Sequence, residues 1–276
     1  MLGAIEAGGT KFICGVGSGP ADLHAIRIPT TTPQETVAAA VGFLRERGVR
    51  AVGIGSFGPV DLAAGRIAST PKDGWRGFRL RDAVRDALSV PVAFDTDVNA
   101  AALGEARWGA ARGVSDFLYI TVGTGIGGGA MVNGALLHGL AHPEMGHMTV
   151  PHDRARDPFD GVCPYHGDCL EGLASGPAMA ARWGRPAEEF DAAHQAWALE
   201  AHYLGLGLAN LIYALSPKLI VMGGGVGMQV VERVGAEVTR TLGGYLGTPR
   251  IVAPELGSRA GVLGALALAE TATIAE

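Results

Sequence analysis

The chain has 276 residues, of which 48% are hydrophobic and 18% are charged, and its formal net charge is −5. This length suffices for two modest domains or one large one. The acidic balance argues against a nucleic-acid partner. No apolar run reaches the roughly 18 residues of a membrane span, and the first residues lack the pattern of a signal peptide. Three cysteines argue against a disulfide scaffold, so we expect a cytoplasmic protein.

The first hundred residues alternate between strand and helix patterns. The clearest helix start is Thr32-Pro33-Gln34-Glu35, in which a threonine cap precedes proline and a glutamate closes a capping box. Gly48 ends that helix. The other predicted elements are strands over residues 2–7, 12–16, 49–56 and 92–95, and helices over residues 80–88 and 98–107.

The opening pattern returns in the second half of the chain. Strands are predicted over residues 117–122 and 128–132 around a second glycine turn, followed by an Asn133-Gly134 hairpin signal. Strands alternating with helices indicate an α/β protein, and the repeated strand–turn–strand unit predicts two similar halves with a boundary near residues 108–113. The remaining predictions are helices over 192–214 and 261–271 and a strand over 219–222.

Three glycine turns are candidates for holding phosphate. Glycine permits positive φ, aims backbone N–H groups at one point and leaves room for an approaching oxygen. The first turn adds the hydroxyl of Thr10 and the charge of Lys11, and the third stands before a predicted helix whose N-terminus favours anions. The turns are Gly8-Gly9-Thr10-Lys11, the stretch from Gly123 to Gly129, and Gly223-Gly224-Gly225.

The turns match neither common nucleotide motif. The P-loop pattern GxxxxGK[ST] is absent, because no Gly-Lys pair occurs in the chain. No turn shows GxGxxG opening a helix with an acidic residue about 20 positions later, so a dinucleotide site is disfavoured. Together the turns favour a nucleotide-phosphate site built from hairpins.

A cluster of metal-ligand residue types follows the second half's first hairpin. Cys163, His166 and Cys169, at intervals of three, could supply three ligands of a structural zinc ion. The spacing permits either His147 or His152 as the fourth ligand. The alternative is a metal-free loop with reduced cysteines. Cys14 stands in an apolar strand and is assigned to the core.

Six motifs in order resemble the ROK family of bacterial sugar kinases. They are IEAGGTK, DTDVNAAALGE, TVGTGIGGG, HPEMGH, CPYHGDCLEG and LIVMGGG, and GIGSFGPVD and HPEMGHMTV are similar to the fructokinase branch. The resemblance covers about residues 2–268. It implies the actin-like, ribonuclease H-like sugar-kinase fold, with two α/β domains around a cleft. The expected domains are residues 1–108, joined by a C-terminal helix over about 259–276, and residues 109–258 with the zinc loop.

The resemblance also implies a role for individual residues. Asp97 matches the catalytic aspartate, and the zinc ligands would be His147, Cys163, His166 and Cys169. The residues implied in sugar binding are Asn99, Glu144, His147 and Glu171. Those implied in ATP binding are Gly8, Gly9, Thr10, Lys11, Gly123, Thr124, Gly125, Gly127, Gly223, Gly224 and Gly225.

Two departures from the family pattern concern metals. Glu6 stands where the family more often has an aspartate tied to magnesium. The zinc pattern Cys163-x-x-His166-x-x-Cys169 has one imidazole in place of a thiolate and a shorter spacing than CxCGxxGC.

The resemblance predicts ATP-dependent phosphorylation of D-fructose to fructose 6-phosphate, with Mg²⁺ and a structural Zn²⁺, in a homodimer. Glucokinase or mannokinase activity is the near alternative, because Thr96 stands where relatives often carry an asparagine that contacts sugar. A sugar-sensing repressor is disfavoured, since the first strand begins at Leu2 without a preceding helix-turn-helix. A non-catalytic sugar-binding protein is disfavoured because Asp97 and both hairpin turns are present.

Overall fold

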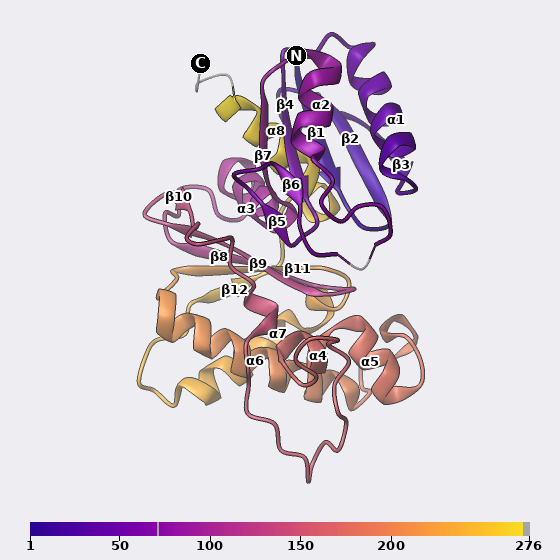
Figure 1. Cartoon of the computed structure of the whole chain (residues 1–276). Helices are drawn as coiled ribbons and strands as arrows, with labels where there is room; N and C mark the ends of the chain where they lie inside the picture. Colours follow the sequence, from indigo (N-terminus) through magenta and orange to yellow (C-terminus); the bar gives the residue numbers. More distant parts are fainter. Residues whose placement is uncertain (71, 273–276) are drawn as a thin grey trace. The chain divides into compact units, whose positions relative to one another are not determined.

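The computed structural model describes residues 1–70 and 72–272 and divides into two compact units (Figure 1). The first contains Met1–Gly113, Leu136–Pro143 and the chain from Glu255 onward, and the second contains Val114–Ala135 and Glu144–Pro254. The short segment Leu136–Pro143 therefore contacts the first unit although both of its neighbours along the chain belong to the second. Each unit is built on its own five-stranded sheet.

The sheet of the first unit has the strand order β3-β2-β1-β4-β7. β1 pairs antiparallel with β2 and parallel with β4, and β4 pairs parallel with β7. A separate two-stranded ribbon joins β5 and β6. The strands are β1 (Leu2–Ala7), β2 (Lys11–Gly17), β3 (His24–Pro29), β4 (Ala51–Ser56), β5 (Val60–Asp61), β6 (Arg66–Ile67) and β7 (Val92–Thr96).

Helices pack on both faces of this sheet because successive side chains of β1 point to opposite sides. Ile5 and Ala7 lie in the core formed with α1 and α2, whereas Leu2 and Ala4 lie in the core formed with α8. At Gly264 a Cβ would meet the carbonyl oxygen of Ala100 at 1.6 Å, so glycine allows α8 to pack closely on α3. The helices are α1 (Pro33–Arg45), α2 (Leu80–Leu88), α3 (Asp97–Trp108) and α8 (Ala260–Ala272), and a 3₁₀ turn η3 (Gly257–Arg259) precedes α8.

The sheet of the second unit has the order β10-β9-β8-β11-β12 and repeats the pairing pattern of the first. Asn133 and Gly134, with φ of 52° and 77°, form the predicted hairpin turn. The strands are β8 (Phe117–Val122), β9 (Ile126–Val132), β10 (Ala135–Leu136), β11 (Leu219–Gly223) and β12 (Arg250–Val252). The helices are α4 (Leu170–Ala174), α5 (Gly176–Trp183), α6 (Ala196–Leu215) and α7 (Gly227–Leu242), with 3₁₀ turns η1 (Met145–His147) and η2 (Ala187–Glu189).

The predicted elements are present, and the two five-stranded sheets share the strand-pairing pattern that the repeated strand–turn–strand unit predicts. The capping of α1 is also confirmed, since Thr32 Oγ1 accepts a hydrogen bond from the Glu35 N–H at 3.3 Å. The prediction omitted the strands β3, β5, β6, β10 and β12 and the helices α4 and α5, most of which are short. β3 is an edge strand with mostly exposed side chains, and β12 has only 3 residues, so neither carries a clear apolar pattern.

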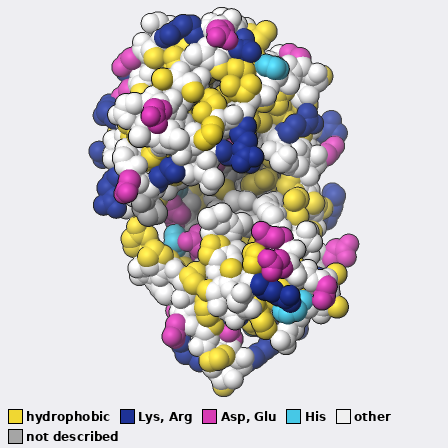
Figure 2. Space-filling view, turned by 90° about the vertical axis from the view of Figure 1, so that its right-hand side faces the viewer, with side chains coloured by type: hydrophobic (Ala, Val, Ile, Leu, Met, Phe, Trp, Pro, Cys, Tyr) yellow, Lys and Arg dark blue, Asp and Glu magenta, His cyan; other side chains and the backbone are white. Residues whose placement is uncertain are grey.

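On the face displayed in Figure 2, lysine and arginine side chains are scattered among acidic and uncharged ones instead of forming one basic patch. Among the described residues, no helix combines the length and the apolarity that crossing a membrane requires.

Candidate active site and metal site

Asp97 is the first residue of α3, directly after β7. The cap of this helix is Thr96, whose Oγ1 accepts a hydrogen bond from the Asn99 N–H at 3.1 Å. An aspartate at the start of a helix is often the cap, but here the preceding residue has that role. The Asp97 side chain is partly exposed, and its Oδ1 accepts from the Val98 N–H at 2.9 Å. Asp97 therefore presents a carboxylate at a strand end, where parallel α/β sheets place reactive groups.

Asn99, predicted to contact sugar, is completely buried in this structure. Its Nδ2 donates a hydrogen bond to Asp95 Oδ1 at 2.8 Å, while its own Oδ1 is buried without a partner among the described residues. Asp95 is 4% exposed and also accepts a bond from the Thr96 N–H at 2.7 Å. Asn99 thus braces the first turn of α3 from inside.

The first glycine turn connects β1 to β2. The Gly8 N–H bonds to the carbonyl of Lys11 at 2.9 Å, and Thr30 Oγ1 donates to the carbonyl of Gly8 at 2.8 Å. Gly9, Thr10 and Lys11 are exposed, and no atom lies within 4 Å of the position of a Cβ on Gly9. The turn is therefore fixed at its base and open at its tip.

Glu6, at the end of β1, is an unusual carboxylate. Its Oε2 is buried without a hydrogen-bond partner among the described residues. Burial raises the pKa of the Glu6 carboxyl, and the charge of Lys11 offsets part of this effect. A Cβ on Gly261 would lie 2.4 Å from Glu6 Cδ, so that glycine makes room for the longer side chain. A buried and unpartnered carboxylate oxygen is suited to a cation.

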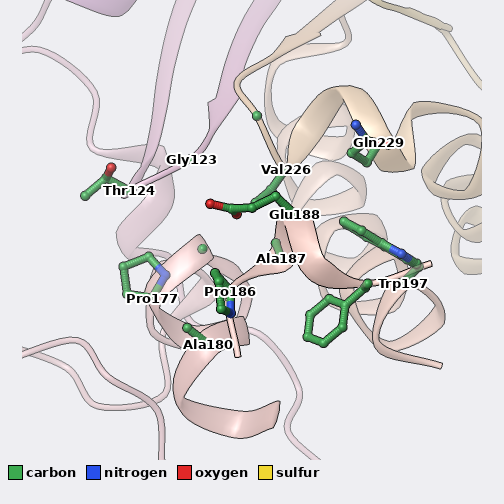
Figure 3. A pocket seen from close by; sticks show the side chains of 13 residues that line it. Gly123, Thr124, Pro177, Ala180, Pro186, Ala187, Glu188, Trp197, Val226 and Gln229 are labelled. Atoms are coloured by element: carbon green, nitrogen blue, oxygen red, sulfur yellow. The ribbon is translucent and has the colours of Figure 1, made fainter. Parts of the chain in front are cut away.

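The second and third glycine turns line one pocket of ≈ 800 Å³ in the second unit (Figure 3). Gly123 and Thr124 form one side, and Trp197 and Gln229 lie across the pocket from Thr124. The carboxylate of Glu188 extends toward the Gly123 side in the view of Figure 3. The other lining residues are Gly176, Pro177, Ala180, Pro186, Ala187, Phe190, Gly225 and Val226. An apolar and aromatic pocket beside two open glycine turns suits a nucleoside with its phosphates.

The physical reason for the glycines differs from the prediction. Positive φ occurs at Gly224, with φ of 85°, but not at Gly8, Gly9, Gly123 or Gly125. Space is the constraint at Gly8 and Gly125, since a Cβ would lie 2.8 Å from the Lys11 carbonyl at Gly8 and 2.7 Å from Glu171 Oε2 at Gly125, whereas Gly9 and Gly123 face open space. The argument from backbone freedom is therefore wrong for the two hairpin turns and correct for Gly224.

The structure brings together His147, Cys163, His166 and Cys169, whose ligand atoms all lie within 4.8 Å of one another. His147 Nδ1 lies 3.7 Å from both sulfur atoms, and His166 Nδ1 lies 3.7 Å from Cys163 Sγ. A tetrahedral zinc ion separates sulfur and nitrogen ligands by about 3.6 Å, given its usual bond lengths. The four residues could therefore hold one metal ion with every ligand position filled.

His152, the alternative fourth ligand, lies outside this cluster. Its Nδ1 is 3.0 Å from Asp168 Oδ2, and its Nε2 is 2.9 Å from the carbonyl oxygen of Asp157. Asp157 in turn accepts a hydrogen bond from the Tyr203 hydroxyl at 2.7 Å. His152 thus ties the residue before Cys169 to the buried side of the loop.

Glu171 lies between the metal cluster and the second glycine turn. Its Oε2 accepts a hydrogen bond from the Ile126 N–H at 2.9 Å, and its Oε1 lies 4.0 Å from His147 Nε2. Glu144, the other carboxylate predicted to bind sugar, is exposed and directly precedes η1. Glu144 and Glu171 thus each lie a few residues from a member of the metal cluster, His147 and Cys169 respectively.

Comparison with known proteins identifies the family. The profile of the ROK family matches residues 2–272. The chain belongs to the ROK family.

The similarity to individual ROK proteins extends over nearly the whole chain. A Bacillus subtilis protein is 47% identical over 100% of this chain and 97% of its own length. A fructokinase of Zymomonas mobilis is 43% identical, covering 98% of this chain and 96% of the relative. The crystal structure of a ROK hexokinase from Thermus thermophilus superposes with a TM-score of 0.82 at 31% identity, covering 100% of this chain and 99% of the other. The matched glucokinases are more distant, at 28–36% identity. The predicted actin-like sugar-kinase fold is confirmed.

Sequence reasoning missed most of the nucleotide-sized pocket. The side chains that shape it, including Pro186, Glu188, Phe190 and Trp197, come from η2, its flanks and the start of α6. No glycine motif marks this stretch. The signal available was a segment leading into a long helix, residues 183–197, with three aromatic residues and one proline, which resembles an ordinary loop.

The raised pKa of Glu6 predicts a pH-dependent effect of Glu6→Gln on stability in metal-free buffer. The unfolded carboxyl ionises near its ordinary value of 4.5, and the folded one at higher pH. The stabilising contribution of Glu6 is thus complete below pH 4.5 and is lost as pH rises through the folded pKa. Glu6→Gln should therefore raise Tm more at pH 8 than at pH 4.5, as measured by thermal melts.

Glu35→Gln is the matched control for this measurement. Hydrogen bonds from the side chains of Thr31 and Thr32 lower the pKa of the exposed Glu35 carboxyl, so the difference in Tm should change with pH in the opposite direction. A Tm difference between Glu6→Gln and wild type that stays constant from pH 4.5 to 8 would contradict a raised pKa of the Glu6 carboxyl.

Proposed function

We propose that this ROK protein is an ATP-dependent fructokinase that converts D-fructose to fructose 6-phosphate. The observation that carries the proposal is the placement of Asp97, a partly exposed carboxylate at a strand end whose helix is capped by another residue. The similarity to fructokinases over nearly the full length supports fructose as the substrate.

In the proposed reaction Asp97 accepts the proton of the 6-hydroxyl of fructose. The hydroxyl oxygen then forms a bond to the γ-phosphorus of ATP, and the bond to the bridging oxygen breaks to release ADP. Such transfers need positioning and charge neutralisation more than covalent help from the protein. Backbone N–H groups of the glycine turns would donate to phosphate oxygens, and the pocket bordered by Thr124 and Trp197 would hold the adenosine.

Magnesium would neutralise the phosphate charge when it is bound with ATP. Glu6 fits a role near this ion, because its buried Oε2 has no partner among the described residues. Lys11, exposed at the end of the first turn, would add a second positive charge.

The metal of the four-residue cluster is proposed to be Zn²⁺ in a structural role. Two thiolates and two imidazoles form a ligand set that zinc prefers, and no ligand position remains for a reactive water. Burial raises the pKa of the Cys169 thiol to about 11, so a bound cation is needed to keep it as a thiolate at neutral pH. The ion would hold the loop that carries Glu144 and Glu171.

A panel of hexoses tests the substrate. Coupled assays of ADP release with fructose, glucose, mannose and N-acetylmannosamine should give the highest kcat/KM for fructose. A higher kcat/KM for glucose or mannose would support the proposed phosphoryl transfer but contradict fructose as the substrate. Absence of turnover with every sugar would refute the kinase assignment.

The proposed base is tested by Asp97→Asn. General-base help is typically worth about 10²–10⁴-fold in rate, so kcat should fall by at least 100-fold while fructose still binds in calorimetry. Asp86→Asn on α2, an exposed carboxylate, is the control and should keep wild-type kcat. A kcat of Asp97→Asn within tenfold of wild type would exclude Asp97 as the base.

The zinc assignment predicts one zinc ion per chain by elemental analysis. Cys169→Ser should lose the ion, lower Tm and raise KM for fructose, since the loop that carries the proposed sugar carboxylates loses its anchor. Cys14→Ala removes the buried thiol of β2 and should keep the full zinc content. Zinc-stripped protein with unchanged Tm and unchanged KM would show that the ion has no structural role.

A further inference from the structure

The segment Leu136–Pro143 carries two histidines, His138 and His142, that the proposed function does not use. The segment belongs to the first unit. His142 is buried, and its Nε2 accepts a hydrogen bond from the Val60 N–H at 3.0 Å. This bond fixes the end of the segment and leaves His138 near its middle to be explained.

His138 contacts the residues that surround the proposed base. Its Nε2 lies 2.9 Å from Asp95 Oδ2 and 3.3 Å from Asn99 Nδ2. Asp95 is two residues before Asp97, and Asn99 is two residues after it. The imidazole therefore lies against the first turn of α3, which presents the Asp97 carboxylate.

The surroundings of Asp95 determine which ring nitrogen of His138 carries the proton. The Asp95 carboxylate already accepts hydrogen bonds at Oδ1 from the Thr96 N–H and from Asn99 Nδ2. A carboxylate offers only acceptors, so the bond at Oδ2 requires a proton on His138 Nε2. In the neutral ring Nδ1 is then a hydrogen-bond acceptor, as in other aspartate–histidine pairs.

The two side chains of the pair differ in exposure. The Asp95 side chain is 6% exposed, whereas that of His138 is 38% exposed. Among the described residues, Nδ1 of His138 has no hydrogen-bond partner, and it is the polar atom on the ring edge opposite the buried contact. The arrangement is that of an imidazole anchored at one nitrogen and available at the other.

We propose that His138 is a hexose-binding residue whose Nδ1 accepts a hydrogen bond from a sugar hydroxyl that is not phosphorylated. Asp95 is the positioning residue that holds the required tautomer. The inference rests on the proposed function, since the proposed role of Asp97 as the base is what places the sugar beside this turn. It adds a contact able to discriminate between hexoses that differ in the direction of one hydroxyl.

Two substitutions of His138 separate sugar binding from a merely structural contact. Gln reaches as far as Nε2 and keeps a donor for Asp95 but has no polar atom at the place of Nδ1. Asn keeps a polar atom at that place and cannot reach Asp95. A lost neutral hydrogen bond should raise KM and the calorimetric Kd for fructose about five- to tenfold in His138→Gln, with little change in kcat. His138→Asn should raise them less.

A purely structural role for His138 gives the reverse order. His138→Gln would then match wild type in KM and Tm, and His138→Asn would be the impaired variant; this result would overturn the inference. His24→Gln, on an exposed histidine of β3, controls for the loss of an imidazole and should leave KM unchanged. Wild-type protein without any hexose-kinase activity would overturn both the proposed function and this inference, whereas wild-type turnover with unaltered KM in His138→Gln overturns only the inference.

Asp95→Asn tests the tautomer independently. An amide nitrogen facing His138 needs an acceptor, so Nε2 would lose its proton and Nδ1 would become a donor. KM for fructose should rise by a factor similar to that of His138→Gln, and the double variant should be no worse than either single one. ¹⁵N shifts of the ring should report the tautomer change in Asp95→Asn. Independent, multiplying effects on KM would show that Asp95 does not act through His138.

Discussion

The hydrogen bond between the Asn99 N–H and Thr96 Oγ1 determines how the chain turns from β7 into α3, and the proposed chemistry depends on that turn. An aspartate at the start of a helix is usually occupied in capping its own N–H groups. Here the threonine takes that task, and the buried Asp95 holds the interior of the turn through three hydrogen bonds. Asp97 follows as a partly exposed carboxylate whose Oδ1 accepts a hydrogen bond from the Val98 N–H. The three successive polar residues Asp95, Thr96 and Asp97 therefore have different roles in this turn.

Much of this arrangement could be predicted from the sequence, but the division of tasks could not. The apolar run before Asp95 and the helical spacing after Val98 locate the strand and the helix. The family motif predicts Asp97 as the catalytic aspartate. Spacing alone did not decide whether Thr96 or Asp97 caps the helix, because both residue types are good caps. The contact between Asp95 and His138 spans 43 residues and depends on a segment that leaves the second unit and returns to it. No local pattern indicates such a contact.

The ligands of the metal cluster could likewise be predicted only in part from local sequence. The spacing of Cys163, His166 and Cys169 predicts a compact set of three ligands, and the structure brings them together. Backbone pairing determines which histidine joins these three residues. Thr149 forms a β-bridge with Cys169, and this bridge places the neighbouring turn that carries His147 beside the sulfur atoms. His152 lies a few residues further along and is turned toward Asp168. The spacing of His147 and His152 is similar, but tertiary contacts place His147 in the cluster and His152 outside it.

Within the second unit, the metal cluster and the second glycine turn are connected through Glu171. One carboxylate oxygen accepts a hydrogen bond from the N–H of Ile126 within that turn, and the other lies 4.0 Å from Nε2 of His147, whose Nδ1 belongs to the cluster. Gly125 is required for this contact, since a side chain there would occupy the position of the carboxylate. A displacement of the loop that holds the cluster would therefore move Glu171 and release the turn at the same time. An ion bound by the cluster would therefore be connected to the second glycine turn through Glu171, and its loss would be expected to disturb the position of both.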